Sequence, residues 1–333
     1  MSQRGDLSSA PTSTVARTNK ELRGLLLPFN TPFKSNEDLD EKGLRANLRK
    51  WNNSGISGYV VLGSTGERVN LNEREYCRTI EVAREEVPEN LLFIVGAGQQ
   101  STRVTLAEIK TAEILGAEAV MVITPSYYRS AITQEALIDY YTTVADSSPV
   151  PVILYSMPDL TGIKIEPETV ARLSSHPNIP AIKDSSADLA GFREILRQVP
   201  DEFAVFTGNG TIFCDALSAG AAGAILALGC VAVELCLEVF RLLESGKSDK
   251  AAALQQKLIP LALAVTKRYG IGGLKAAMDM IDLNGGAVRA PLKPATDDAR
   301  REIASLFQEL ARYQSLSHEA FQERDEFAGV VKT

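Results

Sequence analysis

The sequence predicts an α/β fold, a single (β/α)8 TIM barrel with a C-terminal helical appendage. Eight short apolar segments recur along the chain, and a helical pattern follows each of them. The segments are mostly runs of Val, Ile, Leu and Ala, which is typical of strands buried on both faces of a parallel sheet. Eight such strand–helix units in 333 residues favour a closed barrel.

The apolar segments give the positions of the expected strands. Each has the length of a short strand. They are Gly24–Pro28, Tyr59–Leu62, Leu91–Val95, Ala119–Ile123, Pro151–Tyr155, Pro180–Lys183, Phe203–Phe206 and Gly223–Leu228.

The expected helices lie between the strands and have one apolar face each. In the first of them Leu44, Leu48 and Trp51 follow one another at spacings of four and three residues. The barrel helices are Glu41–Ser54, Glu73–Val87, Thr105–Leu115, Thr133–Ala145, Pro167–Leu173, Leu189–Val199, Thr211–Ala219 and Val233–Leu243.

Two other folds are less well supported. A doubly wound dinucleotide fold needs a GxGxxG turn, and the pairs Gly96/Gly98 and Gly208/Gly210 lack the third glycine. A membrane span over residues 221–240 would carry two glutamates at bilayer depth, which is costly. We therefore expect a buried strand and an amphipathic helix there.

The chain divides into four expected segments. Residues 1–20 form a flexible tail, 21–245 the barrel, 246–315 a C-terminal helical region and 316–333 a polar tail that can fray. The helical region should contain Asp249–Tyr269, Gly273–Ile281 and Ala295–Tyr313. The first tail weakly resembles a mitochondrial transit peptide, but it has few apolar residues, so a disordered tail and a cytoplasmic location are favoured.

Composition excludes several functional classes. The net charge of -7 argues against a nucleic-acid surface. The four cysteines form no CxxC pair, which argues against a zinc site and a disulfide framework. A metal-dependent aldolase normally needs several imidazole ligands, and the chain has only His176 and His318. We therefore expect no metal site.

In a TIM barrel the active site lies at the C-terminal ends of the strands. Lys183 ends the sixth strand, in IPAIKDSS. Burial favours the neutral form of an amine, and a neutral amine can attack a ketone to form a Schiff base. Tyr155 ends the fifth strand and could act as general acid and base. The alternatives are a lysine whose charge extends to solvent or pairs with Asp184, and a core tyrosine with a satisfied hydroxyl.

The turn after the second strand reads Gly-Ser-Thr-Gly-Glu. Its backbone N–H groups and the hydroxyls of Ser64 and Thr65 form a cradle suited to a carboxylate. A plain turn with a capping hydroxyl is the alternative. After the fourth strand Tyr127 and Tyr128 could line the pocket or a subunit interface, and Arg129 could meet a substrate carboxylate.

At these residues the chain resembles the dihydrodipicolinate synthase / N-acetylneuraminate lyase family, from about Leu22 to Leu306. Four motifs match in order and spacing. They are GSTGE (Gly63–Glu67), TPSYY (Thr124–Tyr128), LYSMP followed by Thr161-Gly162, and IKDSS (Ile182–Ser186).

The resemblance implies a metal-free and cofactor-free tetramer made of tight dimers. It implies that Lys183 forms an imine with pyruvate or with the pyruvate half of a substrate. The other implied roles are proton relay for Tyr155, carboxylate binding for Ser64 and Thr65, a contribution to a neighbour's site for Tyr127, and backbone lining of the pocket for Gly208 and Ile225.

The synthases of this family carry an arginine shortly after the strand-five tyrosine. Here Leu160 stands at that position, which argues against dihydrodipicolinate synthesis. The TPSYYR, LYSMP–TG and PNIPAIKDS segments most resemble 4-hydroxy-2-oxoglutarate aldolase, although the animal aldolase has Asn where this chain has Thr65. We expect a class I aldolase with pyruvate or glyoxylate as products. A dihydrodipicolinate synthase or keto-acid dehydratase, and a non-catalytic keto-acid-binding barrel, are the alternatives.

Overall fold

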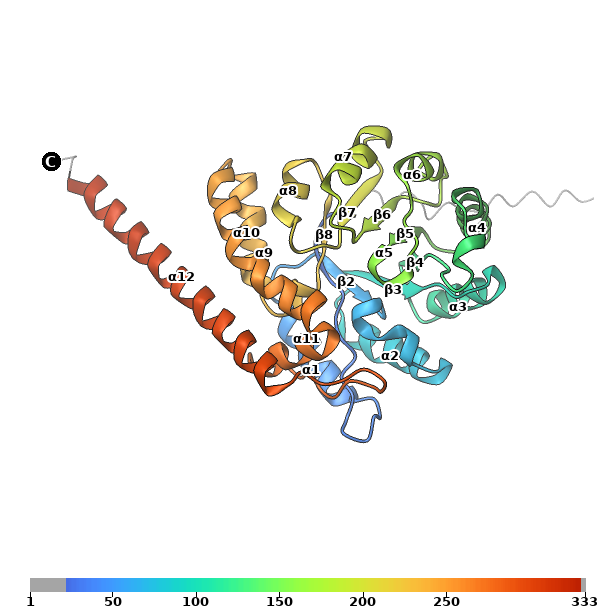
Figure 1. The fold of residues 1–333 in the computed structure, drawn as a ribbon, viewed down its shortest axis with the longest axis horizontal. Coiled ribbons are helices and arrows are strands. Elements are labelled where there is room, and N and C mark those ends of the chain that lie inside the picture. Colours follow the sequence, from blue (N-terminus) through green and yellow to red (C-terminus); the bar gives the residue numbers. More distant parts are fainter. Residues whose placement is uncertain (1–21, 331–333) are drawn as a thin grey trace, which may run out of the picture.

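Eight parallel strands close into a barrel in sequence order, β1 to β8, and helices surround it (Figure 1). The computed structural model describes residues 22–330, and the side chains of residues 22–313. The barrel closes where Gly24 of β1 pairs with Gly223 of β8. The strands are β1 (Gly24–Leu27), β2 (Gly58–Val61), β3 (Leu92–Ala97), β4 (Ala119–Ile123), β5 (Val152–Ser156), β6 (Ala181–Asp184), β7 (Ala204–Thr207) and β8 (Gly223–Ile225).

Alternation along the strands divides the core into two clusters. Leu26, Val60, Ile94, Met121 and Phe206 belong to the smaller cluster, which fills the barrel interior. Their neighbours along each strand belong to a larger cluster shared with the surrounding helices. Successive residues of a strand face opposite sides. The register of each strand therefore decides which side chains can reach the interior.

Five of the eight barrel helices begin at a polar side-chain cap. Asn72 caps α2 in a capping box with Glu75, and the side chains of Asp40, Ser101 and Thr133 cap α1, α3 and α4. The helices are α1 (Glu41–Trp51), α2 (Glu73–Glu86), α3 (Thr102–Ile114), α4 (Gln134–Ser147), α6 (Pro167–Leu173), α7 (Leu189–Gln198), α8 (Phe213–Ser218) and α9 (Val233–Glu244).

The structure confirms the predicted (β/α)8 barrel, with strand ends shifted by at most a few residues. It adds α5 (Pro158–Thr161), a single helical turn that is too short to show a hydrophobic period. Residues 221–240 form β8, a 3-10 turn at Ala227–Cys230 and the start of α9. In the described part of the chain no helix is long and apolar enough to cross a membrane.

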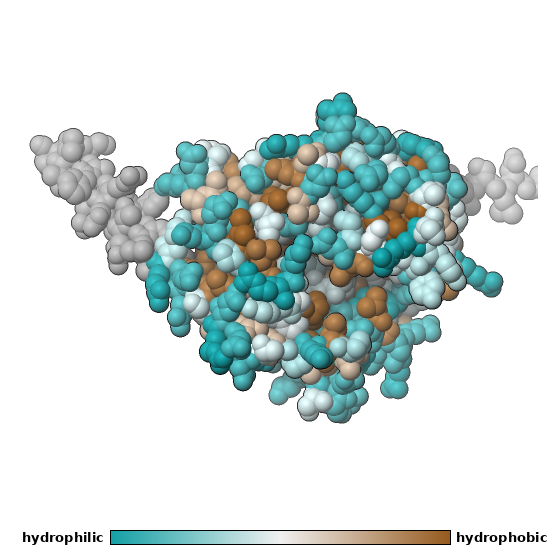
Figure 2. Space-filling model, viewed as in Figure 1, coloured by the Kyte–Doolittle hydropathy of each residue, from teal (hydrophilic) through white to brown (hydrophobic). Residues whose placement is uncertain are grey.

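The C-terminal helices follow the barrel as predicted, with different bounds. They are α10 (Ser248–Leu263), a π-helical turn (Ala264–Arg268), α11 (Gly270–Asp279) and α12 (Asp297–Val330). The ribbon of α12 leads away from the barrel, and its backbone is helical past the end expected at Tyr313 (Figure 1). The face in Figure 2 carries apolar patches separated by hydrophilic side chains.

Candidate active site

Lys183 and Tyr155 lie side by side at the C-terminal ends of neighbouring strands. The parallel register of β5 and β6 pairs Tyr155 with Lys183. Lys183 has the same parity on β6 as Ala181, which belongs to the interior cluster together with Tyr155. Each side chain is only 4% exposed, and the Lys183 Nζ lies 4.5 Å from the centre of the Tyr155 ring. An amine and a phenol are thus held together with little exposure to solvent.

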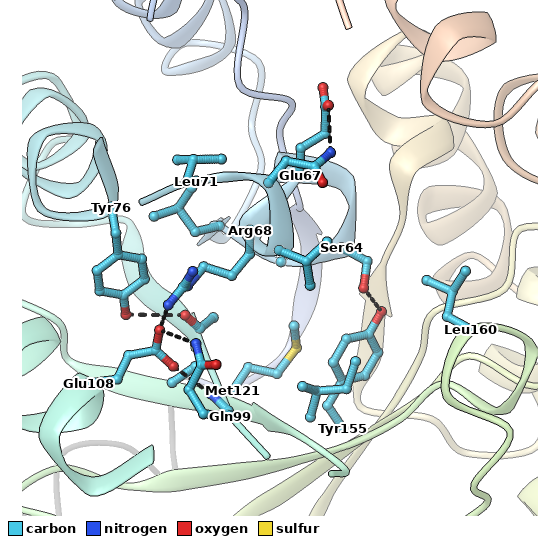
Figure 3. Close-up of a pocket in the computed structure, with 18 of the residues that line it drawn as sticks. Ser64, Glu67, Arg68, Leu71, Tyr76, Gln99, Glu108, Met121, Tyr155 and Leu160 are labelled. Atoms are coloured by element: carbon cyan, nitrogen blue, oxygen red, sulfur yellow. Dashed lines mark hydrogen bonds and ion pairs between the residues drawn. The ribbon is translucent and has the colours of Figure 1, made fainter. Parts of the chain in front are cut away.

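Tyr155 is joined to the glycine-rich turn after β2. Its hydroxyl lies 3.2 Å from the Ser64 Oγ (Figure 3). The turn itself is a 3-10 helix, Ser64–Gly66, which also contains the half-buried Thr65. The first N–H groups of such a turn have no partner within it and can face an anion.

Two left-handed residues enclose this turn. Leu62 has a φ of 58° and Glu67 a φ of 54°. A non-glycine residue in this region costs free energy and persists only where surrounding contacts hold it. The conformation of the turn is therefore imposed by its neighbours.

Gly208 follows β7 and lies against the lysine. Its N–H donates to the Asp184 carbonyl over 2.7 Å. A Cβ at this position would lie 2.7 Å from the Lys183 Cε and even closer to the Ser185 Oγ. Glycine is therefore the residue that leaves room for both side chains. Ile225 is the last residue of β8 and is fully buried in the interior cluster.

Ser185 is a neighbour of the lysine that sequence reasoning missed. A Cβ added to Gly208 would lie 3.0 Å from the Ser185 Cβ and 2.7 Å from the Lys183 Cε. The two side chains therefore lie against the same point of Gly208. The Ser185 backbone N–H donates to the Ser156 carbonyl over 2.9 Å, which anchors it between β5 and β6. The repeated serines of IKDSS gave no sign of which hydroxyl would lie near the amine.

A cavity of about 930 Å³ opens at this end of the barrel. Ser64, Tyr155 and Leu160 line one side of it, and Arg68, Gln99 and Glu108 line another (Figure 3). Thr65, Lys183, Gly208 and Ile225 are not among the lining residues. The Lys183 amine lies 4.5 Å from the ring centre of Tyr155, which does line the cavity.

The second side of the cavity holds a buried ion pair that the sequence did not reveal. Arg68 pairs with Glu108, which also accepts from the Gly98 N–H over 2.8 Å and the Gln99 side-chain amide over 3.1 Å. Arg68 stacks on the Tyr76 ring, 4.3 Å from its centre, and burial lowers the pKa of Arg68. The groups here that could bind an anion, the Arg68 guanidinium and the donors of Gly98 and Gln99, thus contact the Glu108 carboxylate.

Tyr127 does not join the site of its own chain. It is 78% exposed, packs edge-to-face on Tyr128 and is not a lining residue of the cavity. Its N–H donates to the Gln100 side chain over 2.8 Å. Arg129, on the same loop, does not line the cavity either, and its guanidinium lies beside Gly162.

Among the described side chains, no group of three or more His, Cys, Asp and Glu could hold a metal ion. His176 contacts Asp146 over 3.1 Å, whereas His318 lies outside the described side chains. The cysteines are free thiols, and burial raises the pKa of Cys236 to about 12. Such thiols are poor nucleophiles at neutral pH.

Similarity to known proteins extends over most of the chain. The Dihydrodipicolinate synthetase family matches residues 21–310. A 4-hydroxy-tetrahydrodipicolinate synthase of Methanopyrus kandleri is 32% identical over 292 residues, which are 86% of this chain and 97% of that protein.

Solved structures agree with this comparison. The dihydrodipicolinate synthase of Thermotoga maritima superposes with a TM-score of 0.82 at 30% identity, covering 87% of this chain and 98% of the other. A prophage protein of E. coli K12 from the dihydrodipicolinic acid synthase family, solved in complex with pyruvate, superposes with a TM-score of 0.81 at 28% identity, covering 87% and 99%.

Proposed function

The chain belongs to the dihydrodipicolinate synthetase family, and from this premise we propose that Lys183 forms an imine with the keto group of a small 2-keto acid. It is an enzyme of the aldolase and lyase type. The observation that carries the proposal is the buried Lys183 amine, 4.5 Å from the Tyr155 ring centre. No metal and no cofactor takes part in the proposed reaction, because the iminium itself withdraws the electrons.

The proposed reaction begins when the neutral Lys183 amine adds to the keto carbon. Tyr155 donates a proton to the developing alkoxide, and water leaves as the iminium forms. The bond between C3 and C4 then breaks. Its electron pair moves into the iminium to give an enamine, while the Tyr155 phenolate left by the first step takes the proton of the C4 hydroxyl and C4 departs as an aldehyde. Protonation at C3 and hydrolysis release pyruvate and the free amine.

The remaining residues bind and orient the substrate in this proposal. Ser64 and Thr65 hold the carboxylate with hydroxyl and N–H groups, and Ser64 also relays protons to Tyr155 over 3.2 Å. Gly208 and Ile225 contribute backbone to the wall of the pocket beside the lysine. The exposed ring of Tyr127 completes the site of a neighbouring subunit in a homotetramer built as a dimer of dimers.

Leu160 favours aldol chemistry over dihydrodipicolinate synthesis. It lines the cavity beside Tyr155, where a synthase would need a cation for the carboxylate of aspartate semialdehyde (Figure 3). We therefore propose cleavage of 4-hydroxy-2-oxoglutarate, or a similar 4-hydroxy-2-keto acid, to pyruvate and glyoxylate or another aldehyde. Synthesis from pyruvate and aspartate semialdehyde is the second candidate, since the similar Methanopyrus kandleri protein is a synthase of that type.

We place the reaction in the cytoplasm. The mitochondrial alternative depends on residues 1–20, which lie outside the described residues. Import of a fusion of these residues to a reporter protein would support that alternative.

Borohydride trapping with pyruvate tests the proposal. Intact-mass and peptide mass spectrometry should find one pyruvate-sized adduct, located on Lys183. Lys183→Ala should lose the adduct, whereas Lys164→Ala, which removes a lysine bound to Asp188 and Glu166, should keep it. Absence of an adduct in folded protein would leave the non-catalytic keto-acid-binding barrel. Pyruvate release from 4-hydroxy-2-oxoglutarate, compared with condensation of pyruvate and aspartate semialdehyde, then separates the two candidate reactions.

A further inference from the structure

We infer that Glu67 and Lys275 are positioning residues: their buried ion pair lets the C-terminal helix α11 hold the turn that receives the substrate carboxylate. This inference rests on the proposed imine chemistry. In this way a helix outside the barrel, α11, affects the binding of the substrate.

The pair is almost completely removed from water. The Glu67 and Lys275 side chains are 1% and 2% exposed, and the Lys275 Nζ lies 2.6 Å from the Glu67 Oε1. The ammonium also donates to the Thr31 carbonyl over 2.8 Å and the Ala287 carbonyl over 2.6 Å. The ammonium is thus held by one ion pair and by hydrogen bonds to two carbonyls.

The other oxygen of the Glu67 carboxylate accepts two hydrogen bonds. This Oε2 accepts from the Asn70 side chain over 3.2 Å and from the Arg289 N–H over 3.3 Å. The Glu67 side chain is therefore contacted by α11, by the segment around Arg289 and by Asn70, which follows the turn. Rotation of the carboxylate would break several of these contacts together.

Glu67 also belongs to the backbone of the carboxylate-binding turn. It ends the turn in a left-handed conformation, with its N–H donating to the Ser64 carbonyl over 3.1 Å. The Thr31 hydroxyl donates to the Gly66 carbonyl over 2.7 Å, and the Thr31 carbonyl is itself bonded to Lys275. Lys275 therefore fixes the turn at two points, directly at Glu67 and through Thr31.

The other end of the same turn carries the chemistry. Ser64 contacts the Tyr155 hydroxyl, and Glu67 extends from the opposite side of the turn (Figure 3). A left-handed glutamate persists only where its surroundings hold it. Loss of the ion pair should let the turn relax, which withdraws Ser64 and Thr65 from the carboxylate position.

The test compares two ketones that differ in the carboxylate. Pyruvate has one and hydroxyacetone does not, although both can form an imine with Lys183. The measurement is the rate of borohydride-trapped adduct formation for each ketone, expressed as the ratio of pyruvate to hydroxyacetone. A general loosening of the fold slows both rates, whereas misplacement of the carboxylate cradle lowers the ratio.

Two variants remove the pair in different ways. Lys275→Met leaves Glu67 buried without its cation. Glu67→Gln keeps the shape of the side chain but removes its charge. Because burial lowers the pKa of Lys275, the Lys275 ammonium can lose its proton in this variant, and the variant should remain folded. In each folded variant we expect the ratio to fall by about tenfold or more, as for a misplaced binding group. If Lys275→Met does not fold, Glu67→Gln carries the test.

Asn47→Ala is the matched control. Asn47 donates to the Asn284 carbonyl over 2.9 Å and accepts from its N–H over 2.7 Å, so it anchors the segment after α11 without contacting the turn. Its ratio should stay at the wild-type value. A wild-type ratio in folded Glu67→Gln, or an equal fall in Asn47→Ala, would overturn the inference. Absence of a pyruvate adduct in the wild-type protein would instead refute the proposed function.

Discussion

Gly208→Ala tests the geometry around the lysine with the addition of a single methyl group. The new Cβ would lie 2.7 Å from the Lys183 Cε and 3.0 Å from the Ser185 Cβ. Carbon atoms in good contact are about 3.5–4.0 Å apart, so the lysine methylene has to move by about 1 Å. The change adds no charge and no polar group.

The expected effect on activity follows from that displacement. A misplacement of about 1 Å near the reacting atoms costs roughly 10²-fold in rate. We therefore expect imine formation with pyruvate to slow by about 10- to 100-fold. Extra volume in a packed site typically costs about 1–3 kcal/mol of unfolding free energy, so the variant should remain folded.

The assay is single-turnover borohydride trapping, with urea denaturation to check the fold. Gly210→Ala is the control from the same loop, because its added Cβ would meet the Ala262 Cβ at 3.0 Å and no group of the site. It should lose some stability but keep the wild-type trapping rate. A folded Gly208→Ala with a rate within twofold of wild type would refute the placement of Gly208 against the reactive lysine.

Three further predictions address the proton relay and the polar core. Tyr155→Phe should slow imine formation by about 10²-fold or more in stopped-flow trapping, the scale of general acid–base catalysis. Glu108→Ala leaves Arg68 buried without its carboxylate, and chemical denaturation should show a loss of about 3–5 kcal/mol. Arg289 holds the pKa of Glu75 below its ordinary value. This stabilisation should be present above the ordinary carboxyl pKa and be lost as the pH falls through the lowered value, so Glu75→Gln should destabilise the protein at pH 7 and have little effect in strong acid.

The barrel could be predicted because its signals are local. Strands buried on both faces give continuous apolar runs, and each run can be recognised without knowledge of its partners. Lys183 and Tyr155 could be predicted for the same reason, since both end such runs and the fold directs strand ends to one face. Their roles as imine former and proton relay are predictions that trapping and Tyr155→Phe test directly.

The polar framework of the site could not be predicted from local pattern. Glu67 and Lys275 lie far apart in the sequence, on a turn and a helix that only the folded chain brings together. Arg68 and Glu108 likewise come from separate elements, and neither has a characteristic spacing. Tyr127 could be located on its loop, but the role proposed for it requires a second copy of the chain.

Strand register explains why the reactive pair is sensitive to the core beneath it. A slip of one residue in β6 would turn Lys183 outward and bring Ile182 or Asp184 to the interior, because side chains alternate along a strand. Ala181 lies fully buried two residues before Lys183, on the same face. A larger side chain at Ala181 would therefore clash with the interior side chains directly below Lys183 and displace its amine. In the proposed mechanism the barrel interior therefore sets the height of the amine, and α11 holds the turn whose Ser64 contacts Tyr155.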